Sequence, residues 1–450
     1  MTMLIGNGPV LTNDPANPFV ESGAVLVDGD TIVAVGPEAE LRAQAPDAEF
    51  HDAEGKLIMP ALVNAHTHAY SAYARGGPVS LPTRNFQETL ENLWWRLDRL
   101  LTLEDVKLNA EFTFKEGIRN GVTTFFDHHS SPTAVRGSLA EEAKVARAMG
   151  VRASICFETS DRDGAATTAE EIAENVEFMR SVNVDPDPYV RGMFGLHAAF
   201  TLSQETLEKC IEAKGDVPGG WHVHTAEGPG DEVDSYRKYG KPIVRRFAEL
   251  GMLNEDSLFI HLVHVNNREM ELLVENGAWG VHNPYSNMGN AIGVARVNEL
   301  LHRGVKLGLG TDAYTSDLLA SMGLAKVLMS SSLEDPTIGF MQAVQLLFVN
   351  NPALAAHFFG GGLRALKAGN YAAVITLDSH PHTPLNANSM WGHVLFGLNG
   401  PLVNDTMAGE AAEFRYQPVR RLGEGGMGEV VLALDVDIGR EVAIKRPHRD

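Results

Sequence analysis

Apolar and polar positions change their pattern near residue 60 of the chain. Upstream of it, the runs LIGNGPVLTN and GAVLVDGDTIVAVG alternate as half-buried strands do, and Asp28 and Gly29 lie between two apolar stretches as a hairpin turn requires. Downstream, short apolar runs are each followed by a longer stretch with helical period, which is typical of parallel strands covered by helices. The pattern predicts a small β unit followed by a series of strand and helix pairs.

Eight apolar runs from Leu57 onward can each be followed to a terminal residue, and most of these residues are His, Asp or Asn. The runs end at His66, Asp127, Phe157, His197, His224, His261, Asn283 and Asp312. Eight strand and helix pairs over about 250 residues are typical of one (β/α)8 barrel, whose strands all end at the same mouth. We therefore expect an α/β fold with a (β/α)8 TIM barrel and a functional site at its mouth.

The chain after Asp312 predicts how this barrel is completed. Two helical stretches can close it, and the run LKAGNYAAVITLD then returns to a strand pattern that can pair with the N-terminal β unit. The expected organisation is a small split β-sandwich from residues 1–59 and 363–412, a barrel over residues 60–362, and a separate segment over residues 413–450.

Charge and composition limit the classes of partner. The chain has 37 Lys and Arg against 58 Asp and Glu, a net charge of −21, which disfavours nucleic acid and anionic membranes as partners. We find no apolar run long enough to span a membrane, and the start MTMLIGNGPVLTND lacks a signal-peptide pattern. The two cysteines, Cys156 and Cys210, are far apart and predict no disulfide framework. We expect a cytoplasmic protein.

The motif NAHTHAY gives the strongest local signal. His66 and His68 alternate at the end of an apolar strand, so their side chains project to the same side of it, as a shared metal requires. His224 in WHVHTAE and Asp312 in LGLGTD end two further strands. Each His alone is better explained as a hydrogen-bonded core residue, whereas their joint placement indicates a metal site. Three imidazoles and one carboxylate suit one divalent ion with an open position, with zinc favoured and iron as the alternative.

The same strand ends provide groups for acid–base chemistry. A bound divalent ion lowers the pKa of water toward ~7 and so provides hydroxide. We expect Glu227, just beyond the strand of His224, to take that proton and to deliver it to a ring nitrogen. His261 and Asp312 would orient the hydroxide as it attacks an sp2 carbon. The predicted reaction is hydrolytic loss of ammonia from an amidine-like carbon or a related C–N cleavage.

The residue at the end of the fourth strand indicates whether the site binds one or two metal ions. A binuclear amide-ring hydrolase would use the same barrel but needs a ligand that bridges the two ions, commonly a modified lysine at the end of this strand. The strand YVRGMFGLHAAF ends at His197 and has no lysine. We therefore favour one metal ion and expect His197 to face the substrate.

The longest gap between strand ends, residues 66–127, predicts an insertion over the barrel mouth. It contains Trp94 and Trp95, and for Trp95 substrate contact and packing, including an oligomer contact, are both open. Arg75 is a candidate for recognition of a carbonyl or carboxylate, with a solvated surface arginine as the alternative. His128, at the second strand end, is a candidate for substrate contact or for a plain hydrogen bond.

Five motifs in order, NAHTH, HVHTAE, FIHLVH, VHNPYSN and LGTD, resemble the deaminase and chlorohydrolase branch of the amidohydrolase superfamily over roughly residues 3–407. The resemblance implies a barrel with a split β-sandwich, one zinc or iron ion, and hydrolysis at a nitrogen heterocycle. It implies metal binding by His66, His68, His224 and Asp312, proton transfer by Glu227, and a place beside the metal-bound water for His261. It also implies substrate contact for His197, and Asn283 and Ser286 at the border of the substrate.

Three further segments, ENLWWRLDR, DHHSSP and CFETSDRD, resemble a group of aminohydrolases linked to selenium-dependent purine catabolism. The expected function is therefore deamination of an amino-substituted nitrogen heterocycle such as a purine or pterin. The alternative is hydrolysis of a cyclic amide or a chloro-heterocycle on the same barrel. The expected partners are this small-molecule substrate and a second copy of the chain in a homodimer.

Residues 414–450 depart from the pattern of that branch and resemble the first three strands of a bacterial serine/threonine protein kinase. Gly423, Gly425, Gly426 and Gly428 resemble the loop that covers ATP phosphates, and Lys445 in VAIK resembles the lysine that pairs with them. The other kinase elements do not follow, so we expect a non-functional fragment, with ATP binding as the alternative. A natural fusion, a truncation and an artefact are all open as its origin.

Overall fold

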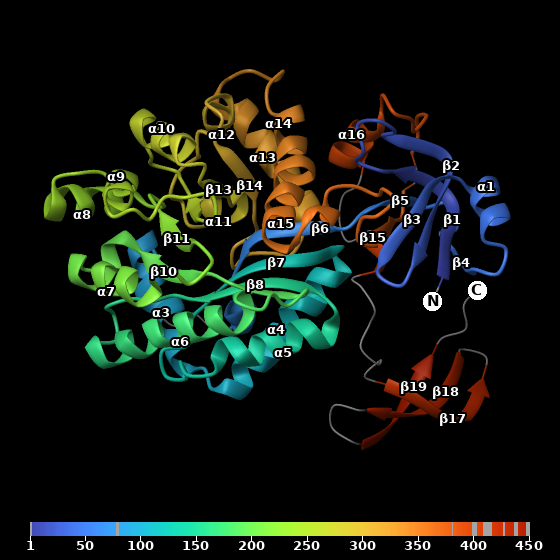
Figure 1. The fold of residues 1–450 in the computed structure, drawn as a ribbon, viewed down its shortest axis with the longest axis horizontal. Coiled ribbons are helices and arrows are strands. Elements are labelled where there is room, and N and C mark those ends of the chain that lie inside the picture. The colour runs from blue at the N-terminus through green and yellow to red at the C-terminus, as the bar shows by residue number, and fades with distance from the viewer. Residues whose placement is uncertain are drawn as a thin grey trace.

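The computed structural model describes residues 2–77, 81–379 and 381–397, together with the backbone of four strands at 403–407, 416–425, 428–435 and 440–446. Figure 1 shows the barrel, surrounded by its helices, at the left of the molecule and a smaller sheet at the right. A separate sheet of C-terminal strands is drawn below this smaller sheet. In the described part of the chain, no helix is long and apolar enough to cross a membrane.

Parallel strands of the barrel coincide with the eight apolar runs. They are β6 (Leu62–Thr67), β7 (Val122–His129), β8 (Arg152–Phe157), β9 (Val190–Gly192) with β10 (Phe194–Ala198), β11 (Trp221–Thr225), β12 (Leu258–His261), β13 (Trp279–His282) and β14 (Lys306–Leu309). β9 and β10 are two parts of the fourth strand, interrupted at Met193. Parallel bridges Thr159↔Leu196 and Thr67↔Asp312 join the two hydrogen-bonded groups of strands, so the barrel is closed. The predicted TIM barrel is confirmed.

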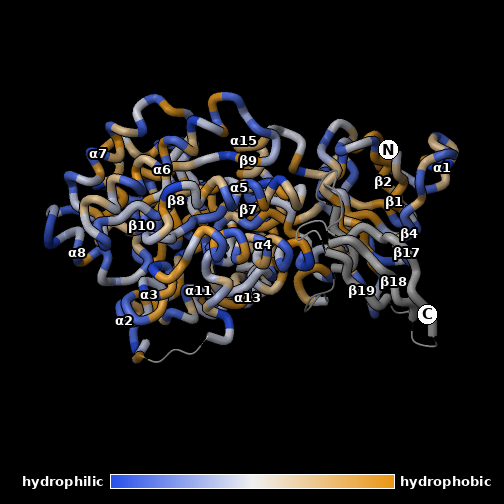
Figure 2. The backbone as a smooth tube through the Cα atoms, turned by 90° about the horizontal axis from the view of Figure 1, so that it is seen from below, coloured by the Kyte–Doolittle hydropathy of each residue, from blue (hydrophilic) through white to orange (hydrophobic). Residues whose placement is uncertain are grey.

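Helices cover the outside of the strands. They are α4 (Leu103–Arg119), α5 (Ser138–Met149), α6 (Ala165–Asn183), α7 (Gln204–Lys214), α8 (Pro229–Tyr239), α9 (Ile243–Glu249), α10 (Asn267–Glu275), α11 (Pro284–Gly289), α12 (Val297–His302), α13 (Leu318–Ser332), α14 (Phe340–Val344) and α15 (Asn351–Phe359). Thr102 and Asn266 begin α4 and α10 with capping boxes, which satisfy backbone N–H groups at the helix starts. Figure 2 shows α8 as mainly hydrophilic, as expected for a helix on the outer surface.

A segment between the first strand and α4 lies over the barrel mouth. After the short helix η1 (Ala69–Ala74) it contains α2 (Phe86–Thr89), η2 (Leu90–Trp94), α3 (Trp95–Leu97) and η3 (Asp98–Leu100). We call residues 81–101 the lid. Its side chains Phe86, Leu90, Trp94 and Trp95 line the cavity that the barrel histidines also line, so the predicted insertion over the mouth is present.

The smaller sheet takes strands from both ends of the chain. It contains β1 (Thr2–Leu11), β2 (Phe19–Asp28), β3 (Thr31–Pro37), β4 (Glu49–Asp52), β5 (Leu57–Pro60), β15 (Val374–Leu377) and β16 (Val403–Met407), with α1 (Glu38–Gln44) beside them and α16 (Met390–Gly392) later in the chain. β15 runs antiparallel to β5, which confirms the predicted pairing of the late strand with the N-terminal unit. The predicted hairpin at Gly29 joins β2 to β3.

Two details of this sheet differ from the sequence pattern. The strands of the predicted sandwich are hydrogen-bonded into one sheet, because β1 pairs with β4 over Met3–Gly6 and with β5 at Val10. The run LIMPALVNA also divides at Ala61, since β5 belongs to the small sheet and β6 to the barrel.

The C-terminal segment forms a sheet of its own. Its strands β17 (Tyr416–Gly425), β18 (Gly428–Asp435) and β19 (Arg440–Arg446) are antiparallel. Gly426 and the side chain of Lys445 lie outside the described residues, as does the predicted boundary between residues 412 and 413. The kinase resemblance and the domain boundaries therefore stay predictions.

Candidate active site

The strand ends converge as the barrel geometry predicts. His66 lies near the end of β6 and His68 directly follows this strand, His224 lies in β11, His261 ends β12, and Asp312 follows β14. All five side chains are at least nine-tenths buried. Four of them, all except His66, line one cavity together with Glu227.

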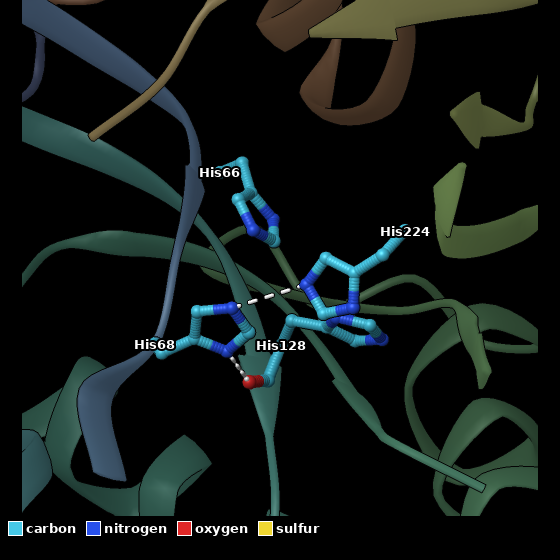
Figure 3. Close-up of side chains that lie close together, drawn as sticks. All are labelled: His66, His68, His128 and His224. Atoms are coloured by element: carbon cyan, nitrogen blue, oxygen red, sulfur yellow. Dashed lines mark hydrogen bonds between the residues drawn. The ribbon is translucent and has the colours of Figure 1, made fainter. Parts of the chain in front are cut away.

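Backbone carbonyls orient two of the imidazoles. A carbonyl oxygen only accepts, so His68 Nδ1–H donates to the carbonyl of His128 at 2.6 Å and His224 Nδ1–H donates to the carbonyl of His197 at 2.7 Å. The two remaining Nε2 atoms lie 3.2 Å apart (Figure 3). In neutral rings both carry lone pairs that face each other, which is unfavourable unless a positive charge lies between them.

His66 and Asp312 complete this donor set. His66 Nδ1 is within 2.9 Å of His222 Nε2, and its own Nε2 is buried with no hydrogen-bond partner among the described residues. Asp312 Oδ1 lies 3.3 Å from His68 Nε2. Three imidazole nitrogens and one carboxylate fit a divalent cation, and ligating histidines characteristically donate their second ring N–H to a carbonyl or another acceptor. The residues present therefore fit the metal that the sequence predicts.

The electrostatics show where positive charge is favoured. Burial opposes the charged form of His68, but the hydrogen bond and charge of Asp312 raise its pKa to about 9. Burial likewise opposes ionisation of Asp312, yet the bond to His68 and the charges of His68 and His261 hold the pKa of this carboxyl well below its usual range. Burial and the neighbouring His68 lower the pKa of His66. The space between His68 and Asp312 therefore favours positive charge, as a cation site requires.

Glu227 and His261 form the acid–base part of the site. Glu227 Oε2 and Asp312 Oδ2 each lie 3.5 Å from His261 Nε2. His261 Nδ1–H donates to Asn287 Oδ1 at 2.8 Å, which leaves Nε2 as an acceptor toward the cavity. Burial, with the charges of Asp312 and Asp231, raises the pKa of Glu227 well above its ordinary value. This carboxyl can therefore hold a proton near neutral pH.

The backbone at these strand ends is unusual. Ala226, His261 and Asp312 have φ values of 50°, 74° and 55°, in the left-handed region that residues other than glycine rarely adopt. Such residues cluster at functional sites, where surrounding contacts hold them. Asp231 provides one such contact, because its carboxylate accepts the N–H of Ala226 at 3.0 Å, next to Glu227.

Two of the predicted substrate-facing residues line the cavity. His197 Nδ1 bonds Thr201 Oγ1 at 2.9 Å, and the ring centroids of Trp95 and His197 lie 5.9 Å apart in an edge-on arrangement. Trp94, Tyr70 and Phe200 also line the cavity, so aromatic side chains form much of its wall.

The other four predicted substrate-facing residues do not line this cavity in the described structure. His128 is fully buried and stacks on His222, with ring centroids 4.5 Å apart. Asn283 is fully buried, and the hydroxyl of Ser286 accepts a hydrogen bond from Asn290. Arg75 pairs with Glu116 on α4. Substrate contact by these four residues therefore stays a prediction.

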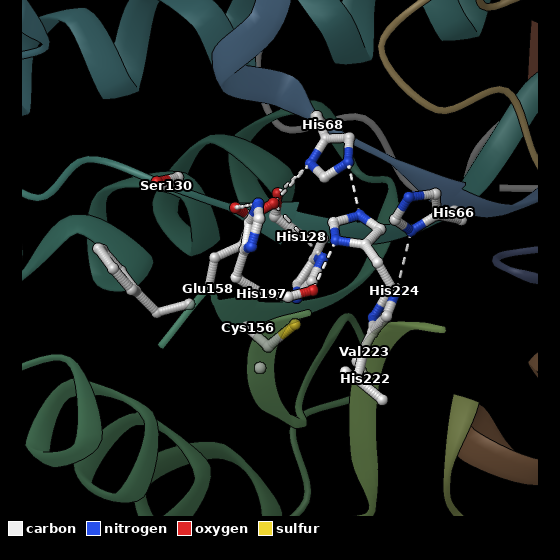
Figure 4. Close-up of polar contacts among 12 residues, drawn as sticks. His66, His68, His128, Ser130, Cys156, Glu158, His197, His222, Val223 and His224 are labelled. Atoms are coloured by element: carbon white, nitrogen blue, oxygen red, sulfur yellow. Dashed lines mark hydrogen bonds and ion pairs between the residues drawn. The ribbon is translucent and has the colours of Figure 1, made fainter. Parts of the chain in front are cut away.

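Sequence reasoning missed three features of the site. Glu158 lies one residue beyond the end of β8 and lines the cavity (Figure 4). Burial raises its pKa to about 8, against the charges of His68 and Arg162. Asn287 orients His261, and a buried pair of Arg162 with Asp98 at 3.0 Å ties the lid to the barrel. The available signal was the position of Glu158 directly after a strand end, since such residues face the mouth.

Fold and site together define a barrel hydrolase whose buried histidines and carboxylate fit a divalent metal ion. Residues 57–389 match the model of the Amidohydrolase family, and residues 23–48 match that of a bacterial imidazolonepropionase-like composite domain. The chain belongs to the amidohydrolase family, whose members use a divalent metal, and it is a hydrolase acting on carbon–nitrogen bonds other than peptide bonds.

Curated relatives align with most of the chain. A 5'-deoxyadenosine deaminase of Methanosarcina mazei is 31% identical over 412 residues, 90% of this chain and 91% of the relative. A 5-methylthioadenosine/S-adenosylhomocysteine deaminase of Syntrophobacter fumaroxidans is 32% identical over 389 residues, 84% of this chain and 85% of the relative.

Solved structures show the same fold. An adenosine deaminase from Xanthomonas campestris with bound zinc superposes with a TM-score of 0.79 at 24% identity, covering 92% of both chains. The E. coli guanine deaminase gives a TM-score of 0.77 at 18% identity and covers 90% of this chain and 98% of its own.

Proposed function

We propose that this chain is an aminohydrolase that removes ammonia from an amino-substituted nitrogen heterocycle, a purine, pterin or similar ring, with one zinc ion. The observation that carries the proposal is the position of Glu227. A carboxyl that favours its protonated form lies 3.5 Å from His261 and beside Asp312, at the edge of three imidazoles whose free nitrogens fit a cation.

Each residue has a distinct task in this reaction. His66, His68, His224 and Asp312 would hold a divalent cation, which would supply hydroxide at neutral pH by lowering the pKa of water. Glu227 takes the proton released, holds it because its pKa is raised, and donates it to the ring nitrogen next to the reacting carbon. It then moves the proton of the added hydroxyl group to the amino group, which leaves as ammonia. His261 Nε2, held as an acceptor by Asn287, orients the nucleophile toward that carbon. His197 and Trp95 contact the ring from the wall of the cavity.

The relatives support this choice of reaction. The two curated relatives described above are named as deaminases of adenosine derivatives. The structure adds an aromatic cavity wall, which suits a planar heterocycle because stacked rings bury apolar surface. Ammonia release therefore accounts for both the donor set and the cavity.

The first test is an ammonia-release assay on the zinc-loaded protein with a panel of aminopurines, pterins and aminotriazines. We expect ammonia from at least one ring and close to one metal ion per chain by mass spectrometry. A ring-opened product or chloride without ammonia would instead establish the cyclic-amide or chloro-heterocycle alternative. Two ions per chain would contradict the single-metal assignment.

Glu227→Gln tests the proton transfer directly. We expect this variant to keep its metal and to lose at least about 10²-fold in kcat, because an amide cannot carry the proton. Glu208→Gln, on the outer helix α7, is a matched control that should keep full activity. Unchanged turnover in Glu227→Gln would remove this residue from the mechanism.

A further inference from the structure

We propose that Glu158 is a specificity-determining residue that accepts a hydrogen bond from a ring N–H of the substrate. The substrate class that fits is a fused 2-amino-4-oxo pyrimidine, as in guanine or pterin, which has an N–H next to the carbon that bears the amino group. This inference rests on the proposed function, because it names the substrate class of the same site.

Glu158 has the position that such contact requires. It follows β8, the third strand of the barrel, and is 2% exposed, yet it lines the same cavity as Glu227 and the metal-binding histidines. Its Oε2 lies 3.9 Å from His197 Nε2, and its Oε1 lies 3.3 Å from His68 Nδ1 (Figure 4). Glu158 is thus a carboxyl in the cavity wall that has no assigned task in the deamination step.

The hydrogen-bonding capacity of Glu158 is left unused by its neighbours. Its Oε1 is buried and accepts no hydrogen bond within the described residues, because the N–H of His68 Nδ1 is directed to the carbonyl of His128 at 2.6 Å. His128 Nδ1 lies 3.6 Å away, beyond hydrogen-bond distance. In either protonation state a carboxyl keeps an acceptor oxygen. A buried acceptor without a partner is unfavourable, so a ligand that brings an N–H is favoured over one that does not.

Glu158 and Glu227 reach the cavity from different strands, so one ring can contact both carboxyls through different nitrogens. Glu227 follows β11, the fifth strand, and Glu158 follows β8, the third, so the two carboxyls approach the cavity from different strands. In a 2-amino-4-oxo ring the amino-bearing carbon lies between two ring nitrogens. One of them has a lone pair that takes the proton from Glu227, and the other has the N–H that Glu158 accepts. A ring linked through its 9-position, such as adenosine, has only acceptor nitrogens in its ring.

The remainder of the substrate has space outside this cavity. A second cavity of about 480 Å³ adjoins it and shares Phe86, Phe200 and Asn290 with its lining. The inner cavity, with a volume of about 40 Å³, lies against the lid. Substituents on the ring can extend from the inner cavity into this second cavity, which lies between the lid and α8.

A pair of matched substrates tests this contact. Guanine and 2-aminopurine carry the same amino group, but 2-aminopurine has a lone pair where guanine has the N–H. For the zinc-loaded wild type we expect kcat/KM at least about 10²-fold higher for guanine, since a buried polar group discriminates strongly against a ligand that leaves it unpaired. In Glu158→Leu this ratio should fall below about 10, and Glu158→Gln, whose amide oxygen still accepts, should lie between the two.

Ligand binding gives a second readout that needs no turnover. Trp94 and Trp95 line the cavity, so binding of the unreactive rings xanthine and purine can be followed by tryptophan fluorescence. We expect Glu158→Leu to weaken xanthine binding at least about tenfold relative to purine binding. Glu171→Gln is the matched control, because Glu171 is equally buried, also has its pKa raised to about 8, and accepts the N–H of Ser160 away from the cavity.

The possible failures are distinguishable. If Glu158→Leu lowers kcat/KM equally for both rings and also loses metal, Glu158 only supports His68 and the inference is overturned. If the wild type deaminates 9-substituted adenines alone and Glu158→Leu shows no substrate-dependent effect, the inference fails while the proposed function stands. If no ring releases ammonia, the proposed function itself fails, and equal binding of xanthine and purine would then overturn the role of Glu158 independently.

Discussion

Single hydrogen bonds decide which ring nitrogen each active-site histidine presents. In His68, His224 and His261 the Nδ1 atom is bound to a carbonyl or amide oxygen, so Nε2 faces the site in all three. For His261 this bond comes from a side chain, Asn287, whereas main-chain carbonyls serve the other two. A substitution at Asn287 can therefore remove the hydrogen bond that orients His261, whereas a main-chain carbonyl remains after any substitution.

Asn287→Leu is expected to lower kcat about 10- to 100-fold while the metal content stays unchanged, because His261 loses the bond that fixes its tautomer. Steady-state kinetics with metal analysis measures both quantities. Asn276→Ala, which removes a surface amide that bonds only its own helix, should leave kcat unchanged. Full activity in Asn287→Leu would show that the barrel alone holds His261.

The convergence of His66, His68, His224 and Asp312 was predictable from the sequence because parallel strands end at one mouth, whatever their separation along the chain. The direction in which individual side chains near the strand ends point was not predictable from the sequence. Along β7, Asp127 and His129 point toward Glu142 on α5, and His128 points into the barrel and stacks on His222. Successive residues of a strand face opposite sides, which turns Asp127 and His129 toward α5 and His128 into the barrel. His128 packs there against His222 and does not line the cavity, which its proximity to a strand end could not predict.

The lid is attached to the barrel by a buried ion pair. Asp98 in η3 and Arg162 after β8 lie 3.0 Å apart, and their side chains are 2% and 5% exposed. Ser130 donates to the same carboxylate, and the guanidinium lies 5.1 Å from the ring centroid of Trp95, which lines the cavity. One pair therefore holds both the lid and an aromatic wall of the site.

Removing one partner of this pair leaves a buried charge without its counterpart. We expect Asp98→Ala or Arg162→Met to reduce the free energy of unfolding by about 3–5 kcal/mol and to raise KM, since Trp95 loses its support. The double variant Asp98→Leu with Arg162→Met should recover much of the stability. Urea unfolding of the three variants measures the effect. Arg268→Met, which breaks an exposed pair with Glu271, is the control, and an equal loss there would contradict the argument.

The metal site joins parts of the barrel that are far apart in the chain. Its expected ligands come from β6, β11 and the end of β14, and Asp312 is also the residue that bridges to Thr67 where the barrel closes. A cation bound there links the first and last strands. Metal content should therefore influence the stability of the whole barrel and not the site alone.

Chelation of the metal is expected to lower the melting temperature by about 3 °C, because an ion present at 100 times its Kd stabilises the folded state by about 2.7 kcal/mol. Differential scanning calorimetry before and after addition of a chelator measures this shift, and added zinc should reverse it. His357→Ala, which removes a surface histidine paired with Asp256, should show the same shift as wild type. Identical melting of the two forms would contradict a link through the metal.

At the scale of the molecule, strand number, strand order in the barrel and the late return to the small sheet follow from apolar runs and turn signals. The division of LIMPALVNA at Ala61 and the continuity of the small sheet do not, because a local pattern does not specify hydrogen-bond partners. The interruption of the fourth strand at Met193 is of the same kind. In both segments the apolar run continues, but the strands with which its two halves pair are different.

The pairing of β5 with β15 has a consequence for synthesis on the ribosome. Pro60 pairs with Val374, so more than 300 residues must be translated before β15, the partner on this edge of β5, exists. At about 5–20 residues per second this takes roughly 15 to 60 s. During that interval the apolar edge of β5 is open to other nascent chains, as unpaired edge strands are. Expression of this protein should therefore depend on chaperones that shield nascent chains.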